Sequence, residues 1–261
     1  MRINLKNKKA LVGGSTQGLG KAIALQLANC GAEVTLMARN KEKLELVKKE
    51  LNVDFNQNHQ ILVVDFNDFK TYKKIITNYF NSNTIDILVN NTNGPKGGNV
   101  FEKSIDEYQQ AFDLLFKSVV YTTMLALDSM KKNHFGRIIN ATSLTVKEPL
   151  EHLVLSNTIR AAVTTWAKTL SLGVAEYGIT VNNILTGIFD TERIKGLNNL
   201  QAKEKRVSSE TILKNLTTSI PMKRLGNPEE FGYLVSFLAS DYASYITGIN
   251  IPIDGGLIKS L

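Results

Sequence analysis

Short apolar runs alternate along the chain with longer stretches whose apolar positions recur at helical spacing. A strand buried on both faces reads as a continuous apolar run, whereas a surface helix buries a single stripe. This alternation is typical of βαβ units around a parallel sheet. It predicts strands at Lys9–Gly13, Glu33–Ala38, Gln60–Val64, Ile85–Val89, Gly136–Ala141, Thr180–Leu185 and Gly248–Ile253, and helices at Gly20–Asn29, Lys41–Leu51, Phe69–Phe80, Ser104–Asn133 and His152–Tyr177.

The segment Gly187–Ser219 departs from this pattern, because it is polar, charged and poor in strand signal. No linker, internal repeat or low-complexity block divides the 261 residues. About seven strands with helices between them predict an α/β protein with a Rossmann-type, doubly wound parallel sheet in one domain, residues 1–261. We expect residues 188–219 to form a flexible lid, because a polar segment buries little apolar surface.

Composition narrows the class of protein. Hydrophobic residues make up 43% of the chain and charged residues 21%, which is ordinary for a globular protein. A lone cysteine, Cys30, cannot form an internal disulfide, and the charged N-terminus lacks the apolar run of a signal peptide. No stretch approaches the roughly 18 apolar residues of a membrane span. We therefore expect a cytoplasmic protein without a membrane segment, and the sequence singles out no metal ligands.

The net charge of +7 is concentrated in one part of the chain. Between Glu192 and Arg224, eight basic residues face three acidic ones, an excess of +5. A basic stripe for nucleic acid would come with a recognition motif, which the sequence lacks. A solvated polar helix is one interpretation of this segment, and an anionic ligand beside it is the other.

A glycine-rich turn joins the first predicted strand to the first predicted helix. It reads Gly14-Ser15-Thr16-Gln17-Gly18-Leu19-Gly20. Glycines at such a turn let the backbone approach a pyrophosphate, and the helix N-terminus offers unpaired N–H groups to it. Because the turn follows a strand and opens a helix, it predicts dinucleotide binding.

The G-x-x-x-G-x-G spacing of this turn resembles that of the short-chain dehydrogenase/reductases, especially their 3-oxoacyl-acyl-carrier-protein reductase branch. The resemblance runs nearly end to end. Further matching segments are Asn90–Asn93, Gly136–Asn140 leading to Ser143, Val181-Asn182 with Gly187 and Thr191, Pro221–Glu230, Phe237–Ser240, Tyr245–Gly248 and Asp254–Gly256. The resemblance implies reduction of a carbonyl substrate, or oxidation of an alcohol, by a homotetramer.

The position after the second strand selects the nicotinamide cofactor. An acidic residue there would favour NAD(H), but the position is Ala38, followed by Arg39, whose guanidinium can bind a 2′-phosphate. We therefore expect NADP(H) rather than NAD(H). The resemblance assigns the cofactor contacts to Gly14, Ser15, Gln17, Gly18, Leu19, Gly20, Arg39, Asn40, Asp65, Phe66, Asn91, Arg160, Gly187 and Thr191, although a loop cap is the alternative role of Asp65.

The catalytic residues are where the sequence departs from the family. The resemblance implies Asn, Ser, Tyr and Lys, of which only the serine, Ser143, is present. Ser156 stands at the tyrosine position, Arg160 at the lysine position and Leu115 at the asparagine position. A serine hydroxyl is a far weaker acid than a phenol, whose pKa begins near 10, and it is shorter by a ring. Arginine can hold ribose hydroxyls but is a poor proton donor.

Two function classes remain open. The first is an NADP(H)-dependent oxidoreductase with a divergent site built on Ser143, Ser156 and Arg160. The second is a cofactor-binding pseudoenzyme, a sensor or structural subunit without turnover. His152 is one helical turn before Ser156 and belongs to the residue type most often used as a general acid, but a solvated role at the helix start is the simpler interpretation. The loop residue Glu148 could also face the cleft, but a solvated role is again the simpler interpretation, because loop charges usually face water.

Overall fold

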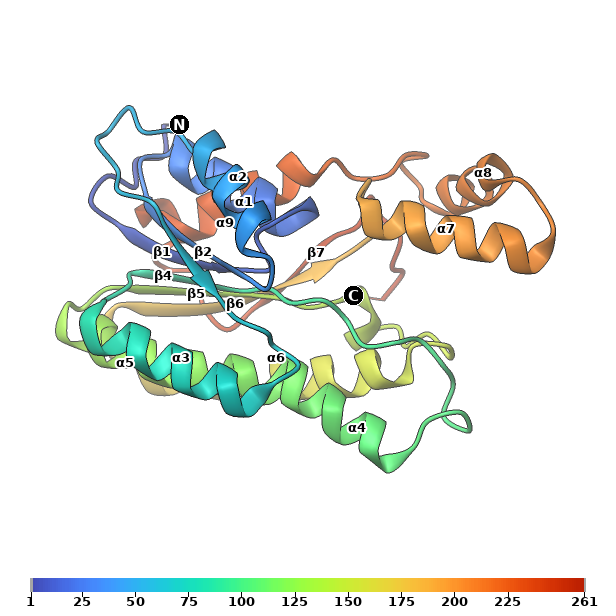
Figure 1. The fold of residues 1–261 in the computed structure, drawn as a ribbon, viewed down its shortest axis with the longest axis horizontal. Helices are drawn as coiled ribbons and strands as arrows, with labels where there is room; N and C mark the ends of the chain where they lie inside the picture. The colour runs from blue at the N-terminus through green and yellow to red at the C-terminus, as the bar shows by residue number, and fades with distance from the viewer. Residues whose placement is uncertain (1, 261) are drawn as a thin grey trace.

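The computed structural model describes residues 2–260, in which seven parallel strands form one sheet. The strands lie in the order β3-β2-β1-β4-β5-β6-β7 (Figure 1). Their bounds are β1 Lys9–Gly13, β2 Glu33–Ala38, β3 Gln60–Val63, β4 Ile87–Asn90, β5 Gly136–Ala141, β6 Ile179–Thr186 and β7 Asn250–Ile253. Each predicted strand is therefore present, with ends shifted by at most two residues.

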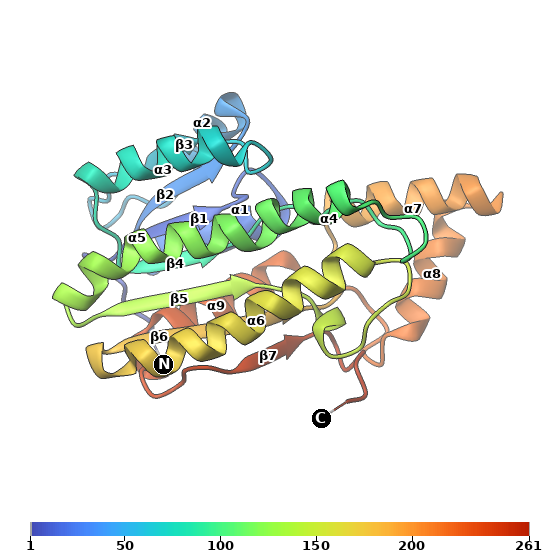
Figure 2. The same cartoon turned by 90° about the horizontal axis from the view of Figure 1, so that it is seen from below.

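Helices cover both faces of this sheet (Figure 1). One face carries α1, α2 and α9, and the other carries α3, α4, α5 and α6 (Figure 2). Their bounds are α1 Gly18–Asn29, α2 Lys41–Glu50, α3 Phe69–Ser82, α4 Ile105–Phe112, α5 Ser118–Lys132, α6 Val154–Val174, α7 Glu192–Lys205, α8 Ser209–Ser219 and α9 Pro228–Ala239. The predicted α/β fold with a doubly wound sheet is thus confirmed.

The strand order reverses between β1 and β4. The chain runs outward from β1 through β2 to β3, then returns to place β4 on the other side of β1, with Ala10 paired to Ile87. Loops from the two halves leave the carboxyl ends of these strands in opposite directions, which opens a crevice there. Helices α7 and α8 project beyond this end of the sheet (Figure 1).

A separate apolar core fills each side of the sheet. Alternate strand residues point to opposite faces, so Val12 packs against α1 and α9 while its neighbour Leu11 packs with α3 and α5. Both side chains are fully buried. Burial on two faces explains why the strand sequences read as continuous apolar runs.

The helix predicted over Ser104–Asn133 is interrupted. Helix α4 ends at Phe112, a π-helical turn spans Asp113–Lys117, and α5 begins at Ser118. The extra residue of a π-helical turn does not alter the apolar spacing enough to be seen in the sequence. Leu115 lies within this turn and is 3% exposed.

Two further differences concern the C-terminal third. Residues 188–219 contain two capped helices, with Thr191 at the N-terminus of α7 and Ser208 at that of α8, where the sequence suggested a polar helix without giving its bounds. Helix α9 was not predicted either, although Pro228 at its first turn and the capping box Asn227–Glu230 are helix-start signals.

A row of asparagine side chains crosses the sheet from β4 to β7. The amide nitrogen of Asn90 donates to Asn140 Oδ1 at 2.8 Å, that of Asn140 donates to Asn183 Oδ1 at 2.9 Å, and that of Asn183 donates to Asn250 Oδ1 at 2.8 Å. Asn90, Asn140 and Asn183 are buried. These bonds satisfy amides that would otherwise be costly inside the sheet.

Candidate active site

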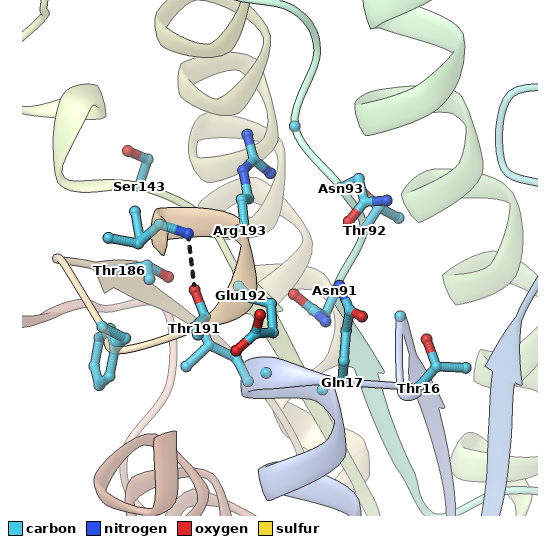
Figure 3. A pocket seen from close by; sticks show the side chains of 18 of the residues that line it. Thr16, Gln17, Asn91, Thr92, Asn93, Ser143, Thr186, Thr191, Glu192 and Arg193 are labelled. Atoms are coloured by element: carbon cyan, nitrogen blue, oxygen red, sulfur yellow. Dashed lines mark hydrogen bonds between the residues drawn. The ribbon is translucent and has the colours of Figure 1, made fainter. Parts of the chain in front are cut away.

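A large cavity, of about 790 Å³, opens at the carboxyl ends of β1, β4, β5 and β6, and Figure 3 shows side chains that line it. Its walls come from the glycine turn, the ends of β2, β4 and β5, the start of α6, and α7. Most of the residues singled out from the sequence line this one space. They are Gly14, Gln17, Gly18, Leu19, Gly20, Arg39, Asn40, Phe66, Asn91, Ser143, Ser156, Arg160, Gly187 and Thr191.

The glycine turn is shaped for close backbone approach. Gly14 and Gly18 have φ of 60° and 54°, in the left-handed region that favours glycine. A Cβ on Gly20 would lie 2.2 Å from the carbonyl oxygen of Gly14, so no side chain fits there. The Asn91 amide donates to Gly13 O at 3.0 Å and braces the turn from β4. The turn leads into the N-terminus of α1, whose free N–H groups suit a pyrophosphate.

Two predicted contacts, Ser15 and Asp65, do not line the cavity. Ser15 is fully buried, and its Oγ accepts from Met37 N at 2.9 Å, which ties the glycine turn to β2. The Asp65 carboxylate accepts the backbone and side-chain N–H groups of Asn67, both at 2.9 Å. Asp65 therefore caps its own loop, the alternative role considered for it. In both cases the polar group is satisfied within the fold and turned from the cavity.

The end of the cavity beside β2 is basic. Ala38 presents no carboxylate there, and the exposed Arg39 follows it. Asn40 caps α2 by accepting from Lys43 N at 2.8 Å, which places Lys43 at the cavity wall as well. Lys43 was not identified as a candidate from the sequence, although it follows Arg39 by only four residues. Two cations and no acidic group at this end suit a phosphate.

The opposite end holds Ser143, Ser156 and Arg160. Ser143 Oγ accepts from the backbone N–H and the hydroxyl of Thr145, at 3.2 Å and 3.0 Å, which leaves its own hydrogen free to donate into the cavity. Ser156 and Arg160 lie one turn apart on α6 and both line the cavity. Arg160 Nη1 donates to Ala141 O at 2.7 Å, so the end of β5 fixes the guanidinium.

Burial and charge both weaken the hold of Arg160 on its proton. Removal from water, together with the smaller effect of the nearby charge of Arg193, lowers the pKa of Arg160 to about 10. Partial burial also lowers the pKa of Arg193. Both side chains remain cationic at neutral pH, so this end of the cavity carries two positive charges.

Arg193 is the main residue that sequence reasoning missed. It belongs to α7 and lines the cavity, with its guanidinium against the backbone of Gly94. The preceding Thr191 caps α7, its Oγ1 accepting from Ile194 N at 3.4 Å (Figure 3). From the sequence, Arg193 was only one of the basic residues between Glu192 and Arg224, because no local sequence feature shows which cation of a helix faces a cavity.

Other candidates lie outside this cavity. Leu115 contacts a smaller space behind Arg160, not the cavity itself. His152 is exposed and is not among the lining residues. Glu148 accepts the backbone N–H groups of Lys259 and Ser260, both at 2.7 Å, and these bonds lower its pKa. Its carboxylate therefore binds the backbone of the C-terminal residues Lys259 and Ser260.

Residues 2–260 contain neither a cluster of metal ligands nor a membrane-spanning helix. No three His, Cys, Asp or Glu side chains in this range are grouped to hold a metal ion. Over the same residues, every helix is too short or too polar to cross a membrane.

Comparisons with known proteins agree on one family. Residues 14–258 match the family model described as enoyl-(acyl carrier protein) reductase. The chain is 33% identical to the NADPH-dependent reductase BacG of Bacillus subtilis over 98% of this chain and 100% of that protein. It is 32% identical to the 3-oxoacyl-[acyl-carrier-protein] reductase FabG of Haemophilus influenzae, over 98% and 100%. The L-sorbose reductase of Gluconobacter frateurii, solved with NADPH and L-sorbose, superposes with a TM-score of 0.93 at 27% identity and covers 100% of both chains.

Proposed function

The chain belongs to the short-chain dehydrogenase/reductase family, and on that premise we propose that it is an NADP(H)-dependent oxidoreductase that reduces a carbonyl substrate through a divergent active site. The observation that carries the proposal is the single cavity with a glycine turn and a basic end on one side and Ser143, Ser156 and Arg160 on the other. Relatives named as NADPH-dependent reductases support the cofactor and the reaction class.

The residues present fit this cofactor. The glycine turn and the N-terminus of α1 receive the pyrophosphate, and Arg39 with Lys43 receives the 2′-phosphate. Arg160 holds hydroxyls of the nicotinamide ribose, while Thr191 lies between the turn and α7 to fix the nicotinamide end. When bound, NADPH supplies the hydride.

Ser143 polarises the substrate carbonyl, because Thr145 donates two hydrogen bonds to its Oγ and leaves the hydroxyl hydrogen free to donate to the substrate. Charge that develops on the carbonyl oxygen is further stabilised by Arg160, since a fixed cation in a partly dry site needs no reorganisation. Ser156 is too short to reach the same oxygen and too weakly acidic to donate a proton. The proton that the alkoxide needs then comes from solvent water, which leaves hydroxide to the bulk solvent.

The second candidate function is a cofactor-binding pseudoenzyme. It is favoured by the absence of a tyrosine among the residues that line the cavity. A positioned general acid contributes about 10²–10⁴-fold to the rate of such reactions, so its loss alone would slow turnover by that factor. Both functions share the cofactor pocket and differ only in chemistry.

NADPH binding and NADPH oxidation, measured on the same preparation, separate the two functions. We expect micromolar or tighter NADPH binding together with slow oxidation by at least one member of a panel of ketones, 3-oxoacyl thioesters and sugars. Ser143→Ala should abolish that oxidation and leave binding unchanged. Binding without oxidation by any member of the panel would favour the pseudoenzyme, and absence of binding would refute both.

A further inference from the structure

Two arginines converge on the substrate end of the cavity without an acidic partner. Across residues 2–260, neither Arg160 nor Arg193 lies within ion-pair distance of a carboxylate. Arg160 gives one hydrogen bond, to Ala141 O, and within the same residues Arg193 gives none. A guanidinium has five N–H donors, so most of these donors are free to face the cavity.

Two other arginines of the fold are paired with carboxylates. The buried Arg137 pairs with Asp241 and donates to the carbonyl oxygens of Gly136 and Gly178. Arg224 forms a two-pronged pair with Glu230, at 2.8 Å and 2.7 Å. The acidic residue nearest in sequence to Arg193 is Glu192, which also lines the cavity but pairs with Lys195 at 3.1 Å. Within residues 2–260, Arg39 and Arg206 also lack an ion pair. What sets Arg160 and Arg193 apart is that the two lie near each other at the substrate end of the cavity.

Keeping two like charges side by side costs free energy, and the cost falls mainly on Arg160, the more enclosed of the two. Their mutual repulsion is visible in the lowered pKa of Arg160, to which the charge of Arg193 contributes. An anion that entered between them would remove this cost and gain charge-assisted hydrogen bonds.

The cofactor phosphates do not fill this role. Thr191 lies beside the glycine turn: a Cβ built on Gly18 would be 3.2 Å from the methyl carbon of Thr191. Arg193 then points away from Gln17 and Thr16, on the side of the cavity where Ser143 lies (Figure 3). The guanidinium of Arg193 lies beside Gly94, because a Cβ built on Gly94 would be 2.8 Å from its Nη2 atom. Gly94 belongs to the loop after β4 and not to the glycine turn.

We infer that Arg193, with Arg160 beside it, forms an anion-binding subsite for the substrate, and that the substrate carries a carboxylate or phosphate close to the carbonyl that is reduced. This inference rests on the proposed function for the position of the carbonyl, but the subsite itself is a property of the two arginines. Because Arg193 belongs to α7, binding of the anion would also fix α7 against the Gly94 loop.

The test is a binding measurement at saturating NADP⁺, which needs no turnover. Ligand-observed NMR gives dissociation constants for two matched pairs of ketones: acetoacetate against acetoacetamide, and dihydroxyacetone phosphate against dihydroxyacetone. We expect one anionic member to bind about tenfold or more tightly than its neutral partner, the effect of one charge-assisted bond. The pair that shows the preference identifies the anion.

Arg193→Gln should remove this preference, because glutamine is polar but carries no charge and is too short to replace the guanidinium. Arg206→Gln is the matched control: Arg206 ends the same helix, carries the same charge and is not a lining residue. The control should retain the preference.

Equal binding of charged and neutral probes to the wild-type protein would overturn the inference, as would a preference that survives Arg193→Gln. A loss of NADP⁺ affinity in Arg193→Gln with the probe preference unchanged would assign Arg193 to the cofactor instead, and would also overturn it. If the preference holds but NADPH is never oxidised, the subsite stands and the reductase function falls.

Discussion

Replacing Ser156 with tyrosine and Arg160 with lysine should convert a feeble reductase into a measurable one. The two positions lie one turn apart on α6 and both face the cavity that contains Ser143. A tyrosine at 156 would extend its ring into open space, with a lysine one turn behind it to lower the pKa of the phenol. The double variant thus restores a proton donor beside a serine that is already present.

The expected gain follows from the chemistry that is restored. A positioned general acid contributes about 10²–10⁴-fold in rate, which lowers the barrier by about 2.7–5.5 kcal/mol. The lower end applies if Leu115, buried within the π-helical turn, leaves no polar group to organise water behind the site. Leu115→Asn added to the double variant should then raise the rate further.

Loss of NADPH absorbance with acetoacetate and with a 3-oxoacyl thioester measures the rate under saturating cofactor. The matched control is Ser156→Phe with Arg160→Lys, which adds the same ring without the hydroxyl and should remain as slow as the wild-type protein. Equal rates for the tyrosine and phenylalanine variants, with NADPH binding intact, would refute the reasoning. So would fast turnover by the wild-type protein, which would mean that another acid acts.

Four further outcomes are expected. NADPH should bind more tightly than NADH, and Arg39→Ala should narrow that gap by about 1–3 kcal/mol in paired titrations; equal affinities in the wild-type protein would contradict the assignment. Asn140→Ala should cost about 2–4 kcal/mol in denaturant unfolding, because it leaves buried amide partners on both neighbouring strands unsatisfied. The Arg224 guanidinium holds the pKa of Glu230 at about 2, so this carboxylate stabilises the fold at neutral pH and loses its effect as the pH falls from about 4.5 to about 2; Glu230→Gln should lower Tm at pH 7 and match the wild-type protein near pH 2. Light scattering should give a tetramer, since apolar side chains such as Leu172, 74% exposed on α6, need a partner surface; a monomer mass at every concentration would exclude it.

The elements of the sheet could be predicted because their signals are local. A strand buried on two faces must be apolar throughout, as Lys9–Gly13 is apart from its first residue, and a turn that forces positive φ must carry glycine, as at Gly14 and Gly18. The sequence allowed a solvated polar helix in this segment but gave no bounds for α7 and α8, because a helix with few apolar positions shows no clear periodicity. Their capping residues, Thr191 and Ser208, were the signal that could have found them.

The candidate site divides in the same way. The sequence by itself determined the phosphate-binding turn, the missing carboxylate at Ala38, and the serine and arginine at positions 156 and 160, because each depends on residue type at a fixed distance along one element. Only the tertiary structure decided that Ser15 faces inward and that Arg193 reaches the same space as Arg160. Those outcomes depend on how α7 packs over the carboxyl ends of the strands, and on which polar groups are already satisfied by distant backbone, neither of which is encoded in local spacing.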